Sequence, residues 1–543
     1  MNNTVFTVDV PHNEPMEIFA PGSPARARLK AELGRQEKTT IDIPLVINGK
    51  EVRTGKTGRV VMPCAHHEVL ATYHKAGERE VAQAIEAALV ARRRWETLSW
   101  VERVSITLKA AELISKKYRD LINAATMLGQ GKSVFQAEVD AACEVIDYLR
   151  YNAYFASKIY SDQPRSGFDQ LNRMEYRPLE GFVFTVSPFN FTAIASNLNM
   201  SVALMGNTTV WKPATTSLLS NYYLMKVFEE AGLPDGVVNF IPGNGALIGS
   251  IALRHRALAG VHFTGSNATF NSLWKSVAGN LENFRSYPRV VGETGGKDFI
   301  FVHASAEPAA VATAIVRGAF EYQGQKCSAA SRAYIPKTLW PKIRELTEEM
   351  VSEIRIGDVR DFRNFVNAVI DEAAFDHIMG YIAKAKSTQG VEVLVGGKGD
   401  KSEGYFIEPT IILTSDPHFV SMEEEIFGPV MSIFVYDDKE FDATLVLCDE
   451  TSPYALTGAV FSQDRHAFVK ACQALRHAAG NFYLNDKPTG AVVGLQPFGG
   501  ARGSGTNDKA GGPLNLHRWV SPRTIKETYV PPTHFAYPFL SAE

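Results

Sequence analysis

The sequence predicts an α/β fold made of two blocks in which strands and helices alternate. Between residues 181 and 281, short apolar runs bounded by turn residues alternate with helical patterns. Such alternation is typical of a parallel, doubly wound sheet that is covered by helices on both faces. A second block of the same kind begins near Gly296, and a polar excursion at residues 161–179 precedes the first block.

The region before the first block is predicted to be mainly helical. Residues 1–40 form an N-terminal arm with one helical pattern at 25–33, and residues 45–52 form a hairpin that turns at Asn48-Gly49. Amphipathic patterning predicts a helix over 78–118. A further helical region at 119–160 is interrupted by the sequence GQGK at 129–132.

The strands of the two blocks follow from their apolar runs. In the first block we expect strands at 181–186, 207–211, 237–241 and 260–264, each followed by a helix. In the second block we expect strands at 297–303, 333–336, 405–412 and 430–436. The tail at 519–531 alternates enough to form one more strand. Ligands of such sheets bind beyond the carboxyl ends of the strands.

The size and composition are those of an ordinary globular protein with two or three domains. The chain has 543 residues, of which 45% are hydrophobic and 21% charged, and its formal net charge is −3. No basic tract is present, so neither nucleic acid nor an anionic membrane surface is an expected partner. No apolar run reaches the ~18 residues of a membrane span.

The cysteines and the N-terminus indicate a reducing compartment. Cysteines at 64, 143, 327, 448 and 472 are scattered and form no CxxC pair, which argues against a disulfide framework and against a metal site. The first 25 residues contain no Arg or Lys, so neither a signal nor a transit peptide is visible. The expected location is the cytoplasm, with the mitochondrial matrix, for a mature organellar form, as the alternative.

The segment 321–332, EYQGQKCSAASR, places the thiol of Cys327 after a Gly-containing bend and beside small residues. Small neighbours give a substrate access to the sulfur, and Lys326 is expected to favour the thiolate. A nucleophilic cysteine needs both properties. Most cysteines are nevertheless small apolar core residues, so this segment alone leaves the structural interpretation open.

Three further motifs accompany this segment in a fixed order. They are SPFNFT at 187–192, GETGGK at 292–297 and EIFGP at 425–429, and Cys327 follows Glu293 by 34 positions. Together the four motifs resemble the aldehyde dehydrogenase superfamily, over the chain from about Ile41 to the C-terminus. The segments FEY at 320–322, NFYLNDK at 481–487 and SGTNDK at 504–509 resemble the branch that oxidises L-glutamate γ-semialdehyde, the open form of Δ1-pyrroline-5-carboxylate.

The resemblance implies an aldehyde dehydrogenase-like fold with a Rossmann-type cofactor domain, an α/β catalytic domain and a β oligomerisation arm. On this basis residues 41–160 and 180–295 form the NAD-binding domain and residues 296–511 the catalytic domain. Residues 161–179 and 512–543 form the oligomerisation arm and tail, in which the tail strand completes the sheet of a partner subunit. The implied assembly is a homodimer or a higher oligomer.

Oxidation of an aldehyde by hydride transfer requires a nucleophile, donors for an oxyanion, a hydride acceptor and a base. By the resemblance, Cys327 is the nucleophile, the Asn190 amide and the Cys327 backbone N–H bind the oxyanion, and Glu293 is the base. Read locally, Asn190 is equally a turn residue and Glu293 a surface glutamate. The hydride acceptor is a dissociable nicotinamide, because no side chain accepts hydride.

No G-x-G-x-x-G motif is present, and the resemblance places the cofactor instead at Phe263-Thr264-Gly265-Ser266 and the helix that follows. One position departs from many NAD-dependent relatives: Thr215 replaces a glutamate that binds the adenosine ribose. NAD is therefore the expected cofactor, with some use of NADP. The implied cofactor residues are Ser187, Lys212, Gly265, Ser266, Asn267, Ala268, Thr269, Glu425 and Phe427.

A turn at residues 487–491, KPTGA, is the implied anchor for the substrate carboxylate, because backbone N–H groups around a glycine turn bind anions. Glu144 is the implied partner of the substrate ammonium, although acidic residues on a helix more often form a solvated face. The implied substrate residues are Glu144, Phe191, Ser328, Gly490, Ala491 and Phe498.

The resemblance as a whole implies NAD-dependent oxidation of L-glutamate 5-semialdehyde to L-glutamate, the second step of proline catabolism, and functional coupling to a proline dehydrogenase. Another semialdehyde dehydrogenase would share Cys327 and Glu293 and differ at Gly490, Ala491 and Glu144. A non-catalytic cofactor-binding or structural protein on this fold is the second alternative, but it would have no need of Cys327, Glu293 and Asn190 together.

Overall fold

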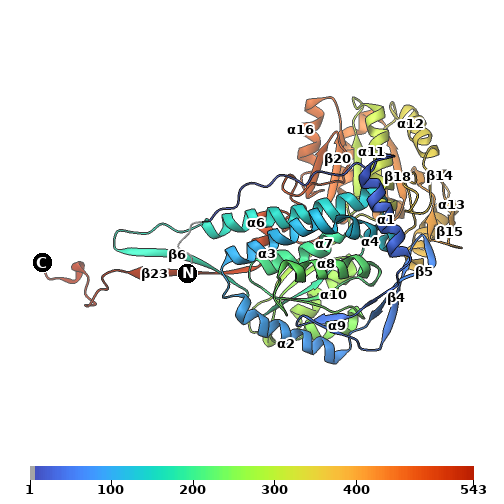
Figure 1. Ribbon diagram of the computed structural model, residues 1–543. Coiled ribbons are helices and arrows are strands. Elements are labelled where there is room, and N and C mark those ends of the chain that lie inside the picture. Colours follow the sequence, from blue (N-terminus) through green and yellow to red (C-terminus); the bar gives the residue numbers. More distant parts are fainter. Residues whose placement is uncertain (1–5) are drawn as a thin grey trace.

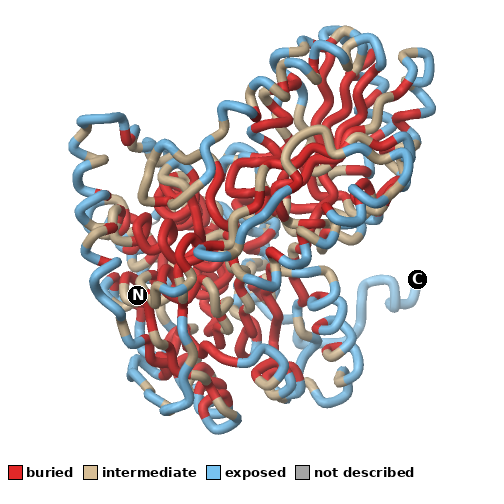
Figure 2. The backbone as a smooth tube through the Cα atoms, turned by 90° about the vertical axis from the view of Figure 1, so that its right-hand side faces the viewer, coloured by how far each residue is buried: buried red, intermediate tan, exposed pale blue. Residues whose placement is uncertain are grey.

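The computed structural model describes residues 6–543 and contains two α/β lobes, each built on a seven-stranded sheet. A two-stranded ribbon projects away from them (Figure 1). The buried residues are concentrated inside the two lobes, with exposed chain around them (Figure 2). Within residues 6–543 no helix has both the length and the apolarity needed to cross a membrane.

The first sheet has five parallel strands in the spatial order β11-β10-β7-β8-β9, which confirms the predicted parallel, doubly wound arrangement. The strand order reverses between β7 and β10, and ligands bind outside the carboxyl ends at such a point. The strands are β7 (Phe182–Val186), β8 (Thr209–Lys212), β9 (Val238–Phe240), β10 (Leu258–Thr264) and β11 (Arg289–Glu293).

A hairpin extends this sheet beyond β9. Strands β2 (Leu45–Ile47) and β3 (Lys50–Val52) pair antiparallel, and β2 bonds to β9. Asn48 and Gly49 have φ angles of 52° and 70°, as a two-residue hairpin turn requires. The predicted hairpin at Asn-Gly is therefore confirmed.

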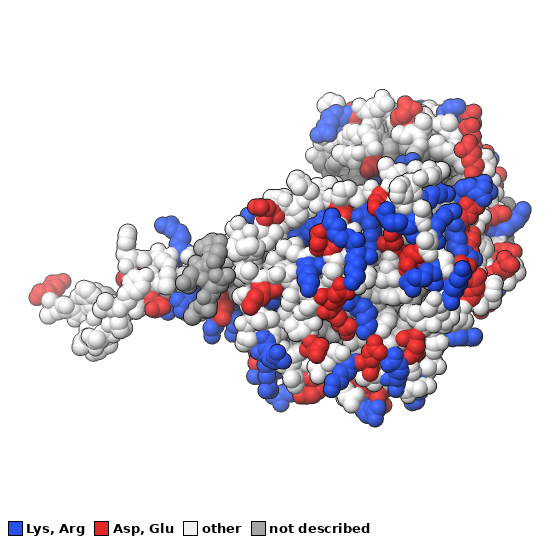
Figure 3. Space-filling model, viewed as in Figure 1, with Lys and Arg blue, Asp and Glu red and all other residues white. Residues whose placement is uncertain are grey.

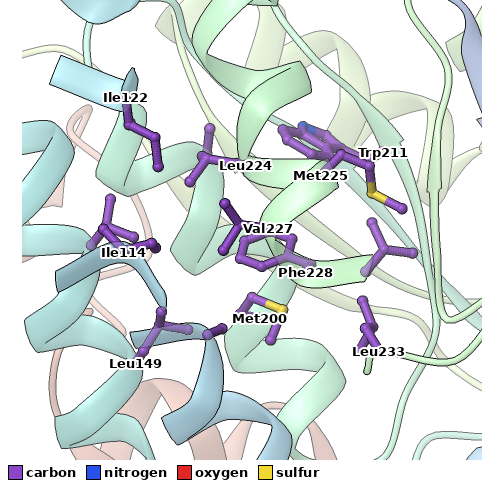
Figure 4. Close-up of a cluster of buried hydrophobic side chains, with 14 of the residues drawn as sticks. Ile114, Ile122, Leu149, Met200, Trp211, Leu224, Met225, Val227, Phe228 and Leu233 are labelled. Atoms are coloured by element: carbon purple, nitrogen blue, oxygen red, sulfur yellow. The ribbon is translucent and has the colours of Figure 1, made fainter. Parts of the chain in front are cut away.

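Helices cover both faces of the first sheet. Val210 and Trp211 are neighbours in β8 and belong to two different apolar clusters, because successive strand residues point to opposite faces. Figure 4 shows the cluster around Trp211, where Phe228 and Met200 pack together. The helices on that face are α3 (Trp100–Leu113), α6 (Val145–Ser161), α7 (Thr192–Leu204) and α8 (Leu218–Ala231). The other face is covered by α2 (Glu78–Trp95), α9 (Gly245–Ala252) and α10 (Asn267–Ala278).

The single helix predicted over 78–118 is wrong, because α2 and α3 are separate helices. Ser99 begins α3: its side chain accepts a hydrogen bond from Glu102 N, and the Glu102 carboxylate accepts one from Ser99 N. This reciprocal cap satisfies N–H groups that would otherwise lack partners, and it therefore fixes a helix start. The interruption after Gln130 is confirmed, since α4 (Arg119–Gln130) ends at Gly131 with a φ angle of 69°.

The second sheet has the order β14-β17-β18-β13-β12-β20-β21 and is parallel except for β14. The prediction of a single strand over 405–412 is wrong. This segment is divided into β16 (Phe406–Ile407) and β17 (Thr410–Thr414) by Pro409, which has no N–H for a strand ladder. The other strands are β12 (Asp298–Val302), β13 (Ala330–Pro336), β14 (Val391–Val395), β18 (Val430–Tyr436), β20 (Thr457–Phe461) and β21 (Asn481–Leu484).

The ribbon is made of β6 (Gln170–Pro178) and the tail strand β23 (Val520–Thr528), which pair antiparallel from Val520 with Pro178 to Thr528 with Gln170. The tail was expected to complete a partner's sheet. Here it pairs along its whole length with the arm of its own chain, so any intersubunit pairing must use the outer edges of the ribbon. The division of the chain into domains stays a prediction.

Candidate active site

A cleft of about 510 Å³ lies between the two lobes, at the carboxyl ends of β7 and β10, and reaches Cys327. The first lobe contributes the segments after these strands, and the second lobe contributes the loop of Cys327 and residues 425–427. Of the predicted site residues, the cleft is lined by Ser187, Asn190, Gly265, Ser266, Thr269, Cys327, Glu425 and Phe427.

Cys327 lies on a tight loop between α11 (Pro308–Phe320) and β13. Tyr322, Gln323 and Gly324 have consecutive φ angles of 53°, 55° and 67°, a left-handed run that is strained for the two residues with side chains. A Cβ on Gly324 would overlap the carbonyl oxygen of Gly428, so only glycine fits there. The predicted Gly-containing bend is confirmed.

The expectation that Lys326 favours the thiolate is wrong. The Lys326 ammonium lies 3.2 Å from a carboxylate oxygen of Glu321, with which it forms a buried ion pair. Burial, together with the nearby carboxyl of Glu293, raises the pKa of the Cys327 thiol well above its ordinary value. Without ligands the residue is therefore a thiol, and it needs a base to become a nucleophile.

Glu293 ends β11 and is half-buried beside the loop at 503–508. Burial raises the pKa of its carboxyl to about 8, while the Lys509 ammonium lowers it and Asp508 raises it further. An enclosed cavity of about 10 Å³, enough for one water, lies beside it and is also lined by Tyr148 and His262. A carboxyl with a pKa near neutral pH is suited to accept a proton from water.

Asn190 follows β7 and is 3% exposed. Its side-chain nitrogen donates to the Gln325 carbonyl at 3.1 Å, which ties the β7 loop to the Cys327 loop. A carboxamide has two N–H groups, so the second one is left for an oxygen in the cleft. This geometry suits an oxyanion donor next to the thiol.

The predicted cofactor side of the cleft contains the start of α10 and a carboxylate. Ser266 caps α10 by accepting from Thr269 N at 3.3 Å, and the free N–H groups at such a helix start bind phosphate oxygens. Glu425 accepts from Gly296 N at 3.1 Å, and a Cβ on Gly295 would overlap its carboxylate. Burial raises the pKa of Glu425 to about 7. Phe427 packs edge-on against Phe189, with ring centres 5.8 Å apart.

Three predicted cofactor residues do not line this cleft. Lys212 ends β8 and lies against Gly245, at the start of α9. Asn267 donates instead to the Gly503 carbonyl at 2.6 Å and faces a separate cleft with Trp274. Ala268 is exposed on α10. Four residues that line the cleft were not predicted. Thr294 and Gly295 belong to the GETGGK motif, which was recognised. Ala374 and His377 belong to α13 (Glu372–Ser387), where no motif was recognised.

The predicted substrate residues lie outside the 510 Å³ cleft. The Ser328 hydroxyl is 2.8 Å from that of Thr489, so the anchor turn is joined to the residue after Cys327. Gly490 has a φ angle of 99°, which explains why a glycine stands there. Phe498 pairs through its backbone with Ala510. Ala491 follows Gly490 and is half-buried.

Glu144 and Phe191 lie among buried charges. Glu144 ends the π-helix η2 (Glu138–Glu144); burial and the Asp140 carboxylate raise its pKa to about 8. The Lys132 ammonium lies 3.8 Å above the centre of the Phe191 ring and 2.8 Å from Asp140. The sequence analysis did not identify Lys132. It also gave the side chain of Lys487 no role, whereas Lys487 Nζ donates to Thr489 O at 3.1 Å.

A thiol and a free amide donor line one cleft between the two lobes, and a carboxyl that titrates near neutral pH lies close to the thiol. This arrangement suits oxidation of an aldehyde through a covalent thioester. The sequence model of the aldehyde dehydrogenase family matches residues 51–525, and the chain belongs to that family.

Similarity to named relatives indicates the branch of the family to which this chain is most similar. The chain is 52% identical over 536 residues to the mitochondrial delta-1-pyrroline-5-carboxylate dehydrogenase of Dictyostelium discoideum, covering 98% of this chain and 96% of the relative. The crystal structure of delta-pyrroline-5-carboxylate dehydrogenase from Mycobacterium tuberculosis bound with NAD is 49% identical, covers 100% of both chains and has a TM-score of 0.96. The 1-pyrroline-5-carboxylate dehydrogenase from Thermus with bound NAD is 32% identical over 96% of this chain and 100% of that one, with a TM-score of 0.90. The predicted superfamily and fold class are confirmed.

The raised pKa of Glu293 predicts that thioester hydrolysis rises with pH. A carboxyl acts as a base only when it is ionised, so kcat should increase through a midpoint near pH 8. Propanal is the substrate for this test, because it carries no ammonium that would involve Glu144. Replacing Glu293 with Gln should slow hydrolysis by ~100-fold or more and abolish the pH-dependent limb, while the first turnover still yields NADH.

The measurement is pre-steady-state NADH formation together with kcat from pH 6 to pH 10. Glu425→Gln is the control, because it removes a different buried carboxyl, which lines the cleft. An unchanged midpoint near pH 8 in Glu293→Gln would rule out this residue as the base.

Proposed function

We propose that this chain oxidises L-glutamate 5-semialdehyde to L-glutamate with NAD, the second step of proline catabolism. Full-length relatives that carry the corresponding enzyme name support the proposal. The observation that carries it is the hydrogen bond between Ser328 and Thr489, because it joins the turn at 487–491 to the residue after Cys327. Such a pairing fits a substrate whose carboxylate lies far from its aldehyde.

The reaction follows from the residues around the cleft. A water in the cleft takes the proton of the Cys327 thiol, and the resulting thiolate attacks C5 of the aldehyde. The developing oxyanion accepts hydrogen bonds from the Asn190 amide and from the Cys327 backbone N–H. Loss of hydride from C5 leaves a thioester on the sulfur. Glu293 takes a proton from a water that attacks this thioester, L-glutamate departs, and the Cys327 thiolate is regenerated.

The residues of the cleft fit NAD, which when bound supplies the hydride acceptor. The start of α10 with Ser266 offers N–H groups to the pyrophosphate, and Gly265 leaves the backbone accessible. Glu425 offers a carboxylate to a ribose, and the absence of a Cβ on Gly295 leaves room for that carboxylate. Thr215 offers no carboxylate to the adenosine ribose, so we expect some use of NADP beside NAD.

The amino-acid end of the substrate is bound at two places. Backbone N–H groups near Gly490 and Ala491 take the carboxylate, with the Lys326 and Lys487 ammonium groups nearby. Glu144 takes the substrate ammonium. Because the pKa of Glu144 is about 8 without ligand, pairing with an ammonium stabilises its ionised form.

The proposal predicts that damage to the anchor turn is selective for the amino-acid substrate. In Gly490→Val a β-branched residue is forced into a left-handed conformation, with its Cβ 2.9 Å from Lys487 Nζ. The kcat/KM for L-glutamate 5-semialdehyde should fall at least ~tenfold, and that for propanal less than ~threefold, since propanal uses no anchor.

The matched control is Gly232→Val, at a glycine with the same φ angle of 99° and no atom near its Cβ position. It reports the effect of backbone strain alone. An equal fall for both aldehydes in Gly490→Val, or a wild type that prefers propanal, would contradict the substrate assignment. A wild type that prefers another semialdehyde would favour the alternative branch of the family.

We also propose a homodimer held by the ribbon of β6 and β23. The ribbon projects from the lobes (Figure 1), and its outer edges present backbone groups with which another strand can pair.

The face in Figure 3 shows Lys, Arg, Asp and Glu interspersed, as expected of a protein without a polyanionic partner. A cytoplasmic or mitochondrial location and coupling to a proline dehydrogenase stay predictions.

The dimer proposal predicts that removing the tail strand disrupts the assembly. A chain ending at Trp519 lacks β23 and exposes the inner edge of β6, so it should elute as monomers or aggregates. A chain ending at Tyr529 keeps the strand and is the control. Light scattering coupled to gel filtration gives the mass, and a dimer of full activity without β23 would contradict the proposal.

A further inference from the structure

The N-terminal arm passes along α6 as extended chain before it reaches α1 (Pro24–Glu37), as Figure 1 shows. The Tyr151 hydroxyl of α6 donates to the Pro11 carbonyl at 3.0 Å. Further along the arm, Glu17 N donates to the Glu138 carboxylate at 2.8 Å. The arm is thus fixed to the helical segment that contains Glu144.

One side chain of the arm joins two parts of the proposed substrate site. The Asn13 side-chain nitrogen donates to Asp147 Oδ2 at 2.8 Å and to the Val493 carbonyl at 2.8 Å. Asp147 lies in the first turn of α6, three positions after Glu144. Val493 lies two positions after Ala491. The amide therefore connects the segment of the ammonium site to the turn of the carboxylate site.

The helix side of this connection is rigid. Asp147 is 3% exposed, and its other oxygen accepts from Glu14 N at 2.7 Å, so the arm engages both carboxylate oxygens. The Glu14 carboxylate in turn accepts from Arg119 at 2.7 Å and from Arg150 at 2.6 Å. Bonds to charged groups of this kind, with little exposure to water, hold their partners in one geometry.

The loop side is held at two points. Thr489 is joined to Ser328, and Val493, which is 5% exposed, is joined to Asn13. The next residue, Gly494, has a φ angle of 82°, and a Cβ there would overlap the Tyr151 ring of α6. Gly490 and Ala491 lie between the two points, so the position of their N–H groups depends on both.

We propose that Asn13 is a positioning residue for substrate specificity: it fixes the carboxylate turn relative to the helical segment that carries Glu144. The inference rests on the proposed function. A substrate held at both its carboxylate and its ammonium reaches Cys327 correctly only if the two sites keep their separation, and small displacements cost much of the rate. Asn13 acts through Asp147 and Val493 and contacts no substrate atom.

The chain offers a control that separates positioning from stability of the arm. Glu17 accepts from Arg28 at 2.8 Å and thereby holds the arm to α1, but its side chain reaches neither Asp147 nor Val493. Glu17→Gln weakens the arm without touching the connection. A role of the arm in stability alone would give Asn13→Ala and Glu17→Gln the same kinetics.

The test compares Asn13→Ala and the isosteric Asn13→Asp, which lacks the donor, with Glu17→Gln and wild type. In both Asn13 variants the KM for L-glutamate 5-semialdehyde and the inhibition constant of L-glutamate should rise about tenfold, the effect of losing a hydrogen bond to a charged partner. The KM for NAD and kcat/KM for propanal should change less than about twofold. Glu17→Gln should leave all four values unchanged.

The energetic coupling between Asn13 and Asp147 gives a second readout. Asp147→Asn weakens the same connection from the helix side, so adding Asn13→Ala to it should raise KM by less than the product of the single effects. Equal losses for propanal, or unchanged constants in both Asn13 variants, would overturn the inference. A wild type that prefers propanal would instead overturn the proposed function, because that result does not involve Asn13.

Discussion

The active site depends on the close approach of chain segments around Cys327, within the second lobe and between the lobes. Gly324 lies against the Gly428 carbonyl, Gly295 against Glu425, and Gly505 against the Gly292 carbonyl, and a Cβ at any of these glycines would overlap its neighbour. These contacts bring the Cys327 loop, the end of β11 and the 425–428 segment together. Glycine at these positions allows the segments to pack closely around the cleft.

Exclusion of water from this junction determines the charge state of the site. Burial raises the pKa of the Cys327 thiol well above its ordinary value and raises the pKa values of Glu293 and Glu144 to about 8. Near neutral pH these groups are largely protonated until a ligand arrives. In the proposed substrate complex, an ammonium beside Glu144 would stabilise that residue's carboxylate. A similar coupling between ligand binding and proton loss is expected wherever a buried acid gains a cation.

Local sequence patterns predicted the fold well where one segment determines its own structure. The strand-helix alternation, the Asn48-Gly49 hairpin and the Gly324 bend all arise from neighbouring residues. The errors at Ser99 and Pro409 also had local signals, a capping box and a strand-breaking proline. By contrast, the pairing of Lys326 with Glu321 and the Asn13–Val493 bond depend on the folded chain. Contacts over 480 positions leave no periodicity that one sequence reveals.

In the proposed reaction, Cys327 carries the glutamyl group during catalysis. The most direct measurement is mass spectrometry of Glu293→Gln after mixing with L-glutamate 5-semialdehyde and NAD, with peptide mapping of the adduct. Slow hydrolysis should leave one γ-glutamyl group per chain on Cys327, formed together with one NADH. NADH formation without an adduct, or an adduct on one of the other four cysteines, would contradict the account.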